Sequence, residues 1–493
     1  MNREIKALRP TTRLLTVEFI EKIIDEACEV LEKTGVWVDY EPALTLLKEA
    51  GVKVDLSKKR AYIGRNFVEE ALKTVPSAVN FYDRNEKLVV ELYGDNCYFE
   101  PGSAATKVWD EEKKVIRDPI TLDTVEHFIV ADYLPYIDGL GGGIVPTDVP
   151  VEIRDRYRLF LSLKYSSKPI TNGGTFTMEG FQVEKELLLV IRGTEKNLKE
   201  KPLCALAACP SPPLKWSDLT CHDLMEGAKY GIPIILISMP LTGAAAPITI
   251  AGSLVQHTAE SLSGVVISQL TKKGAPLIWG GSPAAFDMRF GTTPMGAIET
   301  IMIDMAYSEI GKNLNIPTQA YIGMSDSKCL DAQTGLETAM GTLLGALGGI
   351  NLITGAGMMN FETTQSLEKM VIDNEICGMA RRISQGITGR GEVLAEDLFT
   401  EGLYDGKHFL LSPTTMKWFK KEYYYPGVII SREDDQAWIK KGSTNAQQRA
   451  SMEVKRILTS HKPIPLEENT EKNLQQVITR DAKKYGMEKL PVL

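Results

Sequence analysis

Small and polar residues follow several runs that have the composition of buried strands. Apolar, β-branched runs end near Asn172, Met239, Gly280, Tyr321 and Thr354, and Gly, Ser, Thr, Pro and Asp come next. If these strands are parallel, their carboxyl ends meet on one face, so the loops after them form one site. So many small residues leave an open rim, which suits the docking of something large, such as a cofactor carried on another protein. The alternative is that the glycines only form tight turns.

Cysteine and histidine spacing argues against a metal site. Cys204 and Cys209 lie five apart on one predicted strand, so their side chains point to opposite faces, and Cys221 and His222 follow on a helix. We expect buried thiols here and no bound metal. His257 and Glu260 share one helix face, and we expect them to form a hydrogen-bonded pair rather than a catalytic dyad.

The elements that position these loops alternate regularly. Predicted strands cover 97–100, 137–144, 169–175, 203–209, 233–239, 276–280, 317–323 and 350–355, and predicted helices cover 121–134, 151–166, 177–192, 217–230, 248–273, 293–313, 330–347 and 365–386. Continuous apolar strands joined by helices are typical of parallel sheets. About eight such units predict an α/β fold, a TIM (β/α)8 barrel, over residues 96–386. A doubly wound open sheet is the alternative.

Two extensions flank the predicted barrel. Residues 1–95 are expected to be mainly helical, at 16–33, 41–50 and 67–74, with a strand or two around 78–92. Residues 387–493 are expected to be a helical extension that ends in an exposed segment, 462–493.

Bulk composition excludes several classes of protein. The 493 residues are 43% hydrophobic and 24% charged, and the net charge of −8 comes without a basic stripe, so we expect no nucleic-acid partner. No apolar run approaches the length of a membrane span, and the start of the chain does not resemble a signal peptide. Seven scattered cysteines favour a reducing compartment, so we expect a cytoplasmic protein.

Four ordered segments resemble the trimethylamine methyltransferase family. They are PLTGAAAPITIAGSLVQHTAE (240–260), GGSPAAFDMRFGTTPMGAIE (280–299), GMSDSKCLDAQTGLETAMG (323–341) and NLITGAGMMNFETTQSLEKMVIDNEICGMARR (351–382). The resemblance implies a TIM barrel that moves a methyl group from an amine to the Co(I) of a separate corrinoid protein. Trimethylamine members carry pyrrolysine, whose position falls within Leu330–Gln333 and best matches Ala332. Its absence implies a quaternary amine, glycine betaine first, as the substrate.

Quaternary-amine chemistry then suggests which residues form the site. A trimethylammonium head binds aromatic faces, so we expect Tyr98, Phe99, Phe176, Phe286, Tyr321 and Phe361 to contribute. A betaine carboxylate needs an arginine or hydroxyl donors. This predicts Arg289 as the first candidate and Thr175 and Ser325 as the next ones. We expect Asp326 either to balance the ammonium or to bind the amide-rich rim of the corrinoid. Asp326 and Tyr321 are expected to position the methyl group. No general acid is needed, because the amine leaves neutral.

The sequence is also compatible with two other functions. One is a TIM-barrel lyase or hydrolase with Asp287, Asp326 or Glu362 as a carboxylate base. The other is a barrel that binds betaine without catalysis, and proline betaine or carnitine could replace glycine betaine as the substrate. We expect the corrinoid, a cobalamin, to be supplied by a partner protein, because no corrinoid-binding DxHxxG pattern is present. We also expect a homo-oligomer.

Overall fold

A parallel sheet forms the interior of the computed structural model, which describes residues 7–390, 394–402 and 409–491. One group of parallel strands has the order β14-β12-β10-β9, and a second has the order β16-β17-β6. A parallel bridge between Trp279 and Thr318 joins the two groups. The strands are β6 (Tyr98–Pro101), β9 (Ile170–Asn172), β10 (Cys204–Ala208), β12 (Ile234–Ser238), β14 (Leu277–Gly281), β16 (Gln319–Ala320) and β17 (Leu352–Ala356).

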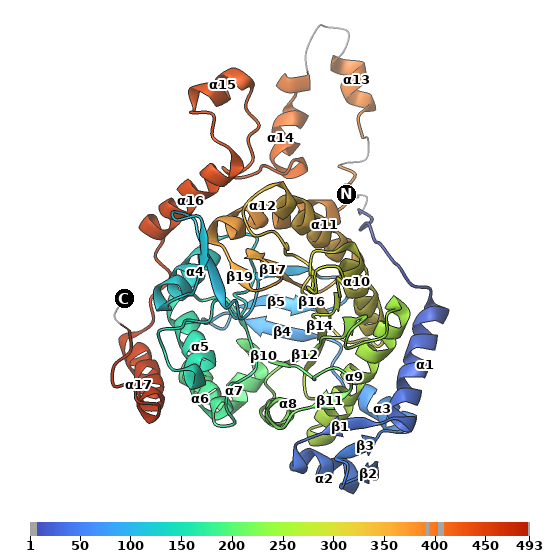
Figure 1. The fold of residues 1–493 in the computed structure, drawn as a ribbon. Helices are drawn as coiled ribbons and strands as arrows, with labels where there is room; N and C mark the ends of the chain where they lie inside the picture. Colours follow the sequence, from blue (N-terminus) through green and yellow to red (C-terminus); the bar gives the residue numbers. More distant parts are fainter. Residues whose placement is uncertain (1–6, 391–393, 403–408, 492–493) are drawn as a thin grey trace.

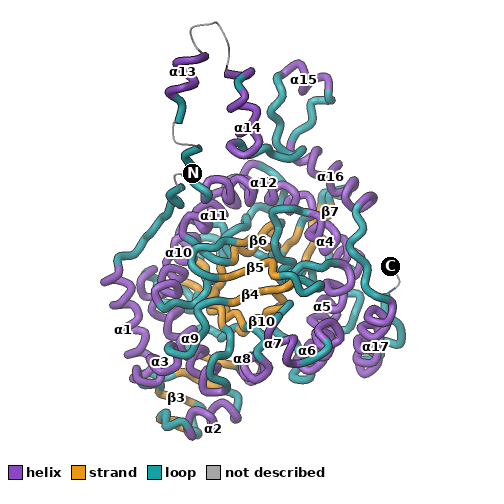
Figure 2. The backbone as a smooth tube through the Cα atoms, turned by 180° about the vertical axis from the view of Figure 1, so that it is seen from behind, coloured by secondary structure: helices purple, strands orange, loops and turns teal. Residues whose placement is uncertain are grey.

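Helices surround these strands on the outside (Figures 1 and 2). They are α4 (Thr121–Tyr133), α5 (Arg154–Tyr165), α6 (Gly180–Arg192), α8 (Asp218–Tyr230), α9 (Ile250–Thr271), α10 (Ile298–Asn313), α11 (Ala332–Gly348) and α12 (Leu367–Ser384), with the short α7 (Glu195–Glu200) and the 3-10 turn η1 (Val151–Ile153) between them. Side-chain caps at Ser217, Thr249 and Ser366 start three of the helices. The predicted alternation of strands and helices is therefore confirmed as a mixed α/β fold.

The second predicted strand, 137–144, does not form as a strand. Its only β contact among the described residues is a bridge from Ile144 to Ala105. Gly141 and Gly143 have φ angles of 53° and 67°, a left-handed backbone that cannot continue a strand. The segment still runs between β6 and β9, because Asp138 N–H donates to Phe99 O at 2.7 Å and Leu140 N–H donates to Pro169 O at 2.9 Å.

The amino-terminal residues mix helices with short strands. They form α1 (Val17–Lys33), β1 (Val36–Val38), α2 (Glu41–Glu49), β2 (Lys53–Asp55), β3 (Arg60–Tyr62), α3 (Arg65–Leu72), β4 (Val79–Tyr82) and β5 (Leu88–Leu92). β1 pairs in parallel with β11 (Lys215–Trp216), which ties this part to the body of the protein. The hairpin β4–β5 lies in the middle of the view in Figure 1, and its apolar side chains share a core with β10, β12 and β14.

The carboxyl-terminal residues form helices of two kinds. The first group consists of α13 (Glu396–Gly402), the 3-10 turn η2 (Phe409–Leu411), α14 (Pro413–Glu422) and α15 (Asp435–Lys440). Helices α13, α14 and α15 project from the body in Figures 1 and 2. α16 (Ala446–Ser460) packs on α12, and α17 (Glu468–Lys484) packs on α5 and α6. The prediction of an exposed segment over 462–493 is wrong for α17. Its Leu474 and Ile478 are buried in the hydrophobic core, because α17 packs on α5 and α6, and its buried Asp481 pairs with the fully buried Arg156 of α5.

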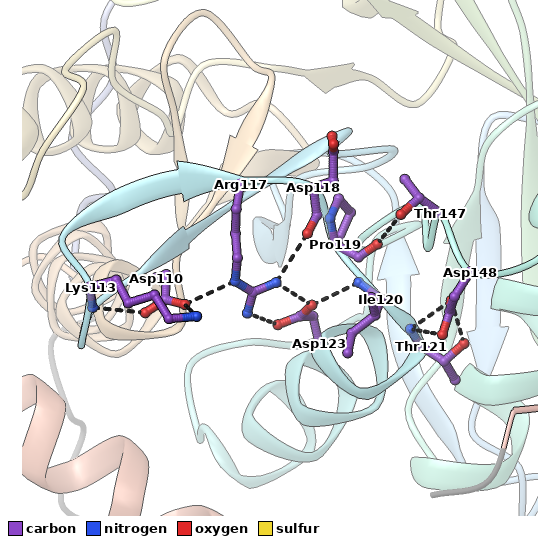
Figure 3. Close-up of polar contacts among 10 residues, drawn as sticks. All are labelled: Asp110, Lys113, Arg117, Asp118, Pro119, Ile120, Thr121, Asp123, Thr147 and Asp148. Atoms are coloured by element: carbon purple, nitrogen blue, oxygen red, sulfur yellow. Dashed lines mark hydrogen bonds and ion pairs between the residues drawn. The ribbon is translucent and has the colours of Figure 1, made fainter.

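A small sheet covers part of the face where the parallel strands end, which is hereafter the carboxyl-end face. It consists of β7 (Lys107–Asp110), β8 (Val115–Arg117), β18 (Met358–Met359) and β19 (Thr364–Gln365), and the pair β13 (Leu241–Thr242) and β15 (Ala284–Ala285) lies in neighbouring loops. Figure 3 shows how Arg117 anchors the hairpin β7–β8. Its guanidinium donates to Asp110 at 2.9 Å and to both oxygens of Asp123, at 2.7 and 2.8 Å, at the start of α4.

Candidate active site

A strained turn lies between β18 and β19 on the carboxyl-end face. Asn360, Phe361 and Glu362 have φ angles of 52°, 57° and 67°, so three consecutive non-glycine residues are left-handed. Each such residue costs about 1–2 kcal/mol, and strain of this kind is typical of functional sites. The Asn360 N–H donates to Ser327 O at 3.0 Å, and Thr363 O accepts from the backbone of β7, so neighbouring loops hold the turn in place.

Glu362 brings a carboxylate to the centre of this face. Ser282, which follows β14, donates its hydroxyl to Oε2 of Glu362 at 2.9 Å. Burial raises the pKa of Glu362 to about 7, although the hydrogen bond from Ser282 opposes the rise. Glu362 in turn adds to the effect of burial on two neighbours: the pKa of Tyr321 is raised well above its usual range, and that of Cys209 is raised to about 12. Residues that follow three different strands, β14, β16 and β10, therefore lie near one carboxylate.

Tyr321 is one of the predicted site residues that the structure places at this centre. It follows β16, and its hydroxyl shares a hydrogen bond with the hydroxyl of Ser103, which follows β6. Ala104 beside it is left-handed, with a φ of 62°. The predicted role of Tyr321 in positioning a methyl group remains a proposal, and its position fits that role.

Ser325 and Asp326 connect the loops that surround the site. Asp326 accepts hydrogen bonds from the backbone N–H groups of Met295 and Gly296, both at 2.8 Å. Ser325 donates to Oε2 of Glu337 at 2.7 Å. Burial raises the pKa of Asp326 to about 6, and the two backbone donors oppose the rise. Both residues thus fix loop geometry, and contact of either one with a substrate remains a proposal.

The predicted aromatic residues do not gather in one place. Tyr98 and Phe99 begin β6, so they lie at its amino end, and the buried ring of Phe99 packs 5.4 Å from the guanidinium of Arg381 on α12. Phe176 is 41% exposed, and Phe286 is half-buried beside β13, whose Thr242 O accepts its N–H at 3.0 Å. Phe361, next to Glu362, already has a cation on its ring, because the ammonium of Lys328 lies 3.9 Å from its centroid.

The predicted carboxylate-binding residues are engaged elsewhere. The side chain of Arg289 is 79% exposed and pairs with Asp287 at 2.7 Å. Thr175 is buried, and both its N–H and its hydroxyl donate to Oδ2 of Asp223, at 3.0 and 2.8 Å. No hydrogen bond or ion pair joins Arg289 to Glu362 among the described residues.

The cysteine and histidine candidates behave as packed side chains. No cluster of three or more His, Cys, Asp or Glu suited to a metal occurs in the described part of the chain. The predicted pair of His257 and Glu260 is wrong. His257 bonds Gly280 O at 3.1 Å and stacks on Tyr307, whereas Glu260 accepts from Ser238, Leu214 and Gln256. The two side chains therefore bond to different partners, and Nδ1 of His257 has no hydrogen-bond partner among the described residues.

Several residues of the candidate site were not predicted from the sequence. Ser103 and Ser282 directly follow strand ends, a signal that could have identified them. Glu100 lies inside the sheet, where Thr171 and Thr354 donate to its two carboxylate oxygens at 2.8 Å, and burial raises its pKa to about 7. Glu362 was considered only as a base for a different reaction. Its left-handed backbone has no sequence signal, because Asn-Phe-Glu is not a typical left-handed segment.

The chain belongs to the trimethylamine methyltransferase (MTTB) family, whose sequence profile matches residues 1–486. It is a methyltransferase of this family. No helix in the described ranges is long and apolar enough to cross a membrane.

Individual relatives extend along almost the whole chain. A glycine betaine methyltransferase of Desulfitobacterium hafniense strain Y51 is 31% identical over 484 residues, covering 98% of this chain and 99% of the relative. A trimethylamine methyltransferase MttB of strain DSM 10664 / DCB-2 of the same species is 30% identical, covering 93% and 92%. The crystal structure of the Methanosarcina barkeri monomethylamine methyltransferase MtmB matches with a TM-score of 0.51 at 11% identity, covering 96% of this chain and 94% of that one. The structural match supports the fold alone.

Proposed function

We propose that this protein transfers a methyl group from a small quaternary amine, glycine betaine first, to the Co(I) of a separate corrinoid protein. The observation that carries the proposal is the cation-binding character of the carboxyl-end face. There Glu362 presents a carboxylate, and the neighbouring Phe361 ring already holds a cation, the ammonium of Lys328, at 3.9 Å from its centroid. The similarity to a glycine betaine methyltransferase over nearly the whole chain supports this choice of substrate.

The side chains of the site suit a substrate whose nitrogen is already charged. A quaternary nitrogen leaves as a neutral amine when it loses a methyl group, so the site needs no proton donor. The corrinoid supplies the nucleophile. The protein must hold the ammonium, orient one methyl group and exclude water, which is catalysis by positioning. Position 332 is an alanine, which begins α11, so this position carries no side chain with the chemistry of pyrrolysine.

We also infer that the parallel strands close into a (β/α)8 barrel. The segment 138–140 bonds to the backbone on both sides, at Phe99 before it and Pro169 after it, and so fills the gap between β6 and β9. The bridge between Trp279 and Thr318 links the two strand groups on the opposite side. A closed barrel would make the carboxyl-end face its mouth, the usual place for catalysis in this fold.

An apolar rim supports docking of a partner protein at this mouth. Ile248, Met288 and Phe290 are 65%, 63% and 76% exposed. Ile248 and Met288 are neighbours, because a Cβ added to Gly243 would lie 2.8 Å from the first and 3.1 Å from the second. Exposed apolar groups at a polar opening indicate an interaction surface. We propose the corrinoid protein as its partner, and a homo-oligomer in a reducing, cytoplasmic setting, where all seven cysteines stay free.

Transfer to reduced cobalamin tests the proposal directly. Purified protein is mixed under anaerobic conditions with Co(I) cobalamin and with glycine betaine, choline, trimethylamine or dimethylglycine. We expect methyl-Co(III) spectra and dimethylglycine from glycine betaine, and no reaction with trimethylamine or dimethylglycine. Turnover of trimethylamine would overturn the argument from charge. Failure of every quaternary amine would overturn the proposed function.

A further inference from the structure

Arg158 on α5 is a buried cation with unused hydrogen-bond donors. Its side chain is 1% exposed, and only Nη1 has a partner, the carbonyl of Gly142 at 3.0 Å. Nε and Nη2 have no partner among the described residues, and no ion pair of Arg158 is found there. Buried donors without acceptors each cost free energy, so a guanidinium in this state needs a reason.

Two glycines lie against this guanidinium at the carboxyl-end face. A Cβ at Gly173, directly after β9, would lie 3.3 Å from Nη2 of Arg158 and would meet nothing else within 4 Å. A Cβ at Gly142 would lie 3.2 Å from Nη1 and 3.2 Å from Cβ of Ser103. Neither glycine has a positive φ, so the backbone conformation does not require glycine at either position. Open space beside the guanidinium is what the absent side chains provide.

The space beside Arg158 borders the candidate active site. Ser103, which faces Arg158 across Gly142, hydrogen-bonds to Tyr321, and Tyr321 interacts electrostatically with both Arg158 and Glu362. A cationic group and an anionic group therefore both lie near the Ser103–Tyr321 pair. This is the charge pattern that complements a small zwitterion.

The nearest acidic side chains do not satisfy Arg158. Asp155 uses its oxygens on the Phe176 N–H at 2.7 Å and on Arg156 at 3.1 Å. Glu184 accepts from Asn172 at 2.8 Å, and burial raises its pKa well above the usual range, which favours its neutral form. Burial also lowers the pKa of Arg158, against the opposing effect of Asp155, Glu184 and Tyr321. The guanidinium charge thus lacks a close anion within the described protein.

We propose that Arg158 binds the carboxylate of the substrate, so that the site selects amino-acid betaines, which carry a quaternary ammonium and a carboxylate, over simple quaternary amines. The inference rests on the proposed function and assigns to Arg158 the role that the sequence suggested for Arg289. A guanidinium offers a planar pair of N–H donors, and Nε and Nη2 are such a pair on one edge. The carboxylate is the group that distinguishes betaine from choline.

Substitution of Arg158 tests the inference through substrate preference. Arg158→Gln keeps a polar hydrogen-bonding side chain but shortens it and removes its charge. We expect kcat/KM for glycine betaine to fall about 10- to 100-fold, which is the range of a lost charge-assisted hydrogen bond. Activity with choline should stay within about twofold of its wild-type value, because choline has no carboxylate. Arg158→Lys should recover part of the betaine activity.

Gly173→Ala provides a second variant that leaves the arginine in place. The added methyl group would meet only Nη2, so the protein should fold normally and bind betaine several-fold more weakly. Gly348→Ala, at the end of α11, is the control for the same exchange, since its nearest neighbour would lie 3.8 Å away. Calorimetric titration with betaine alone, without cobalamin, measures binding independently of methyl transfer.

The outcomes separate this inference from the proposed function. If betaine binds and Arg158→Gln weakens that binding, the inference stands even when no methyl group moves. Equal losses on betaine and choline would overturn it, because they indicate a structural role for Arg158. Loss of betaine preference in Arg289→Gln, with Arg158→Gln unaffected, would also overturn it and return the role to Arg289.

Discussion

Glu362 should make methyl transfer depend on pH near neutrality. Its pKa is raised to about 7 by burial at the centre of the carboxyl-end face. If its carboxylate holds the substrate ammonium, only the ionised form is active. A group with a pKa of about 7 is roughly 10% ionised at pH 6 and roughly 90% ionised at pH 8. We therefore expect kcat/KM for glycine betaine to rise about ninefold between these pH values, since this quantity reports the free enzyme.

Glu362→Gln provides the decisive comparison. The amide keeps the size of the side chain and its contact with Ser282 but cannot ionise, so kcat/KM should be low and nearly independent of pH. The assay follows methyl-Co(III) formation from Co(I) cobalamin between pH 5.5 and 8.5. Methylation of the same cobalamin by methyl iodide corrects for any pH dependence of the acceptor.

Glu368→Gln is the matched control. Burial also raises the pKa of Glu368 to about 7, but this residue lies at the start of α12 beside hairpin β7–β8, among the residues that line a separate surface pocket. Its substitution should leave the ninefold rise intact. A pH dependence that survives in Glu362→Gln, or disappears in Glu368→Gln, would refute the assignment of the cation site to Glu362.

The raised pKa of Glu362 also affects stability. Between about pH 4.5 and 7 the folded protein holds a proton on Glu362 that the unfolded chain releases. The contribution of Glu362 to the free energy of unfolding thus falls as pH rises through this window.

Three further predictions concern the parts that support the site. Asp481→Ala should lower the free energy of unfolding in urea by about 3–5 kcal/mol, because it leaves Asp155 as the one acidic side chain paired with the buried Arg156 among the described residues. Arg480→Ala, which removes an exposed pair with Glu186, should cost less than about 1 kcal/mol. Equal effects would contradict the burial argument. Gly102→Ala should cost about 1–3 kcal/mol, because its Cβ would lie 1.7 Å from Sδ of the buried Met358, and a neutral result in thermal unfolding would show that Met358 moves freely. Arg117→Met should speed hydrogen exchange in the hairpin 107–117 while changing the free energy of unfolding by only about 1 kcal/mol, and unchanged exchange would mean that the bonds in Figure 3 do not anchor it.

Most helices and the strand positions are predictable from local sequence patterns. Helices predicted at 217–230 and 121–134 are observed at Asp218–Tyr230 and Thr121–Tyr133, because periodic apolar residues and end signals such as Ser217 and Gly231 act locally. The buried strands β12 and β14 were found for the same reason, as continuous apolar runs. The strand predicted at 137–144 is wrong, because the sequence does not distinguish a left-handed glycine from an extended one.

The side chains that meet at the candidate site depend on long-range packing. Arg158 lies in a helix rich in charged residues, a pattern typical of a solvent-exposed face, yet it is buried beneath Gly142 and Gly173. Arg289 follows a strand end, as a binding residue would, yet it is exposed and paired with Asp287. Whether a charge is buried, and whether it finds a partner, depends on segments far apart in the chain. Local spacing therefore identified the loops of the face, whereas long-range packing brought Glu362 and Tyr321 together in these loops and buried Arg158 of α5 near them.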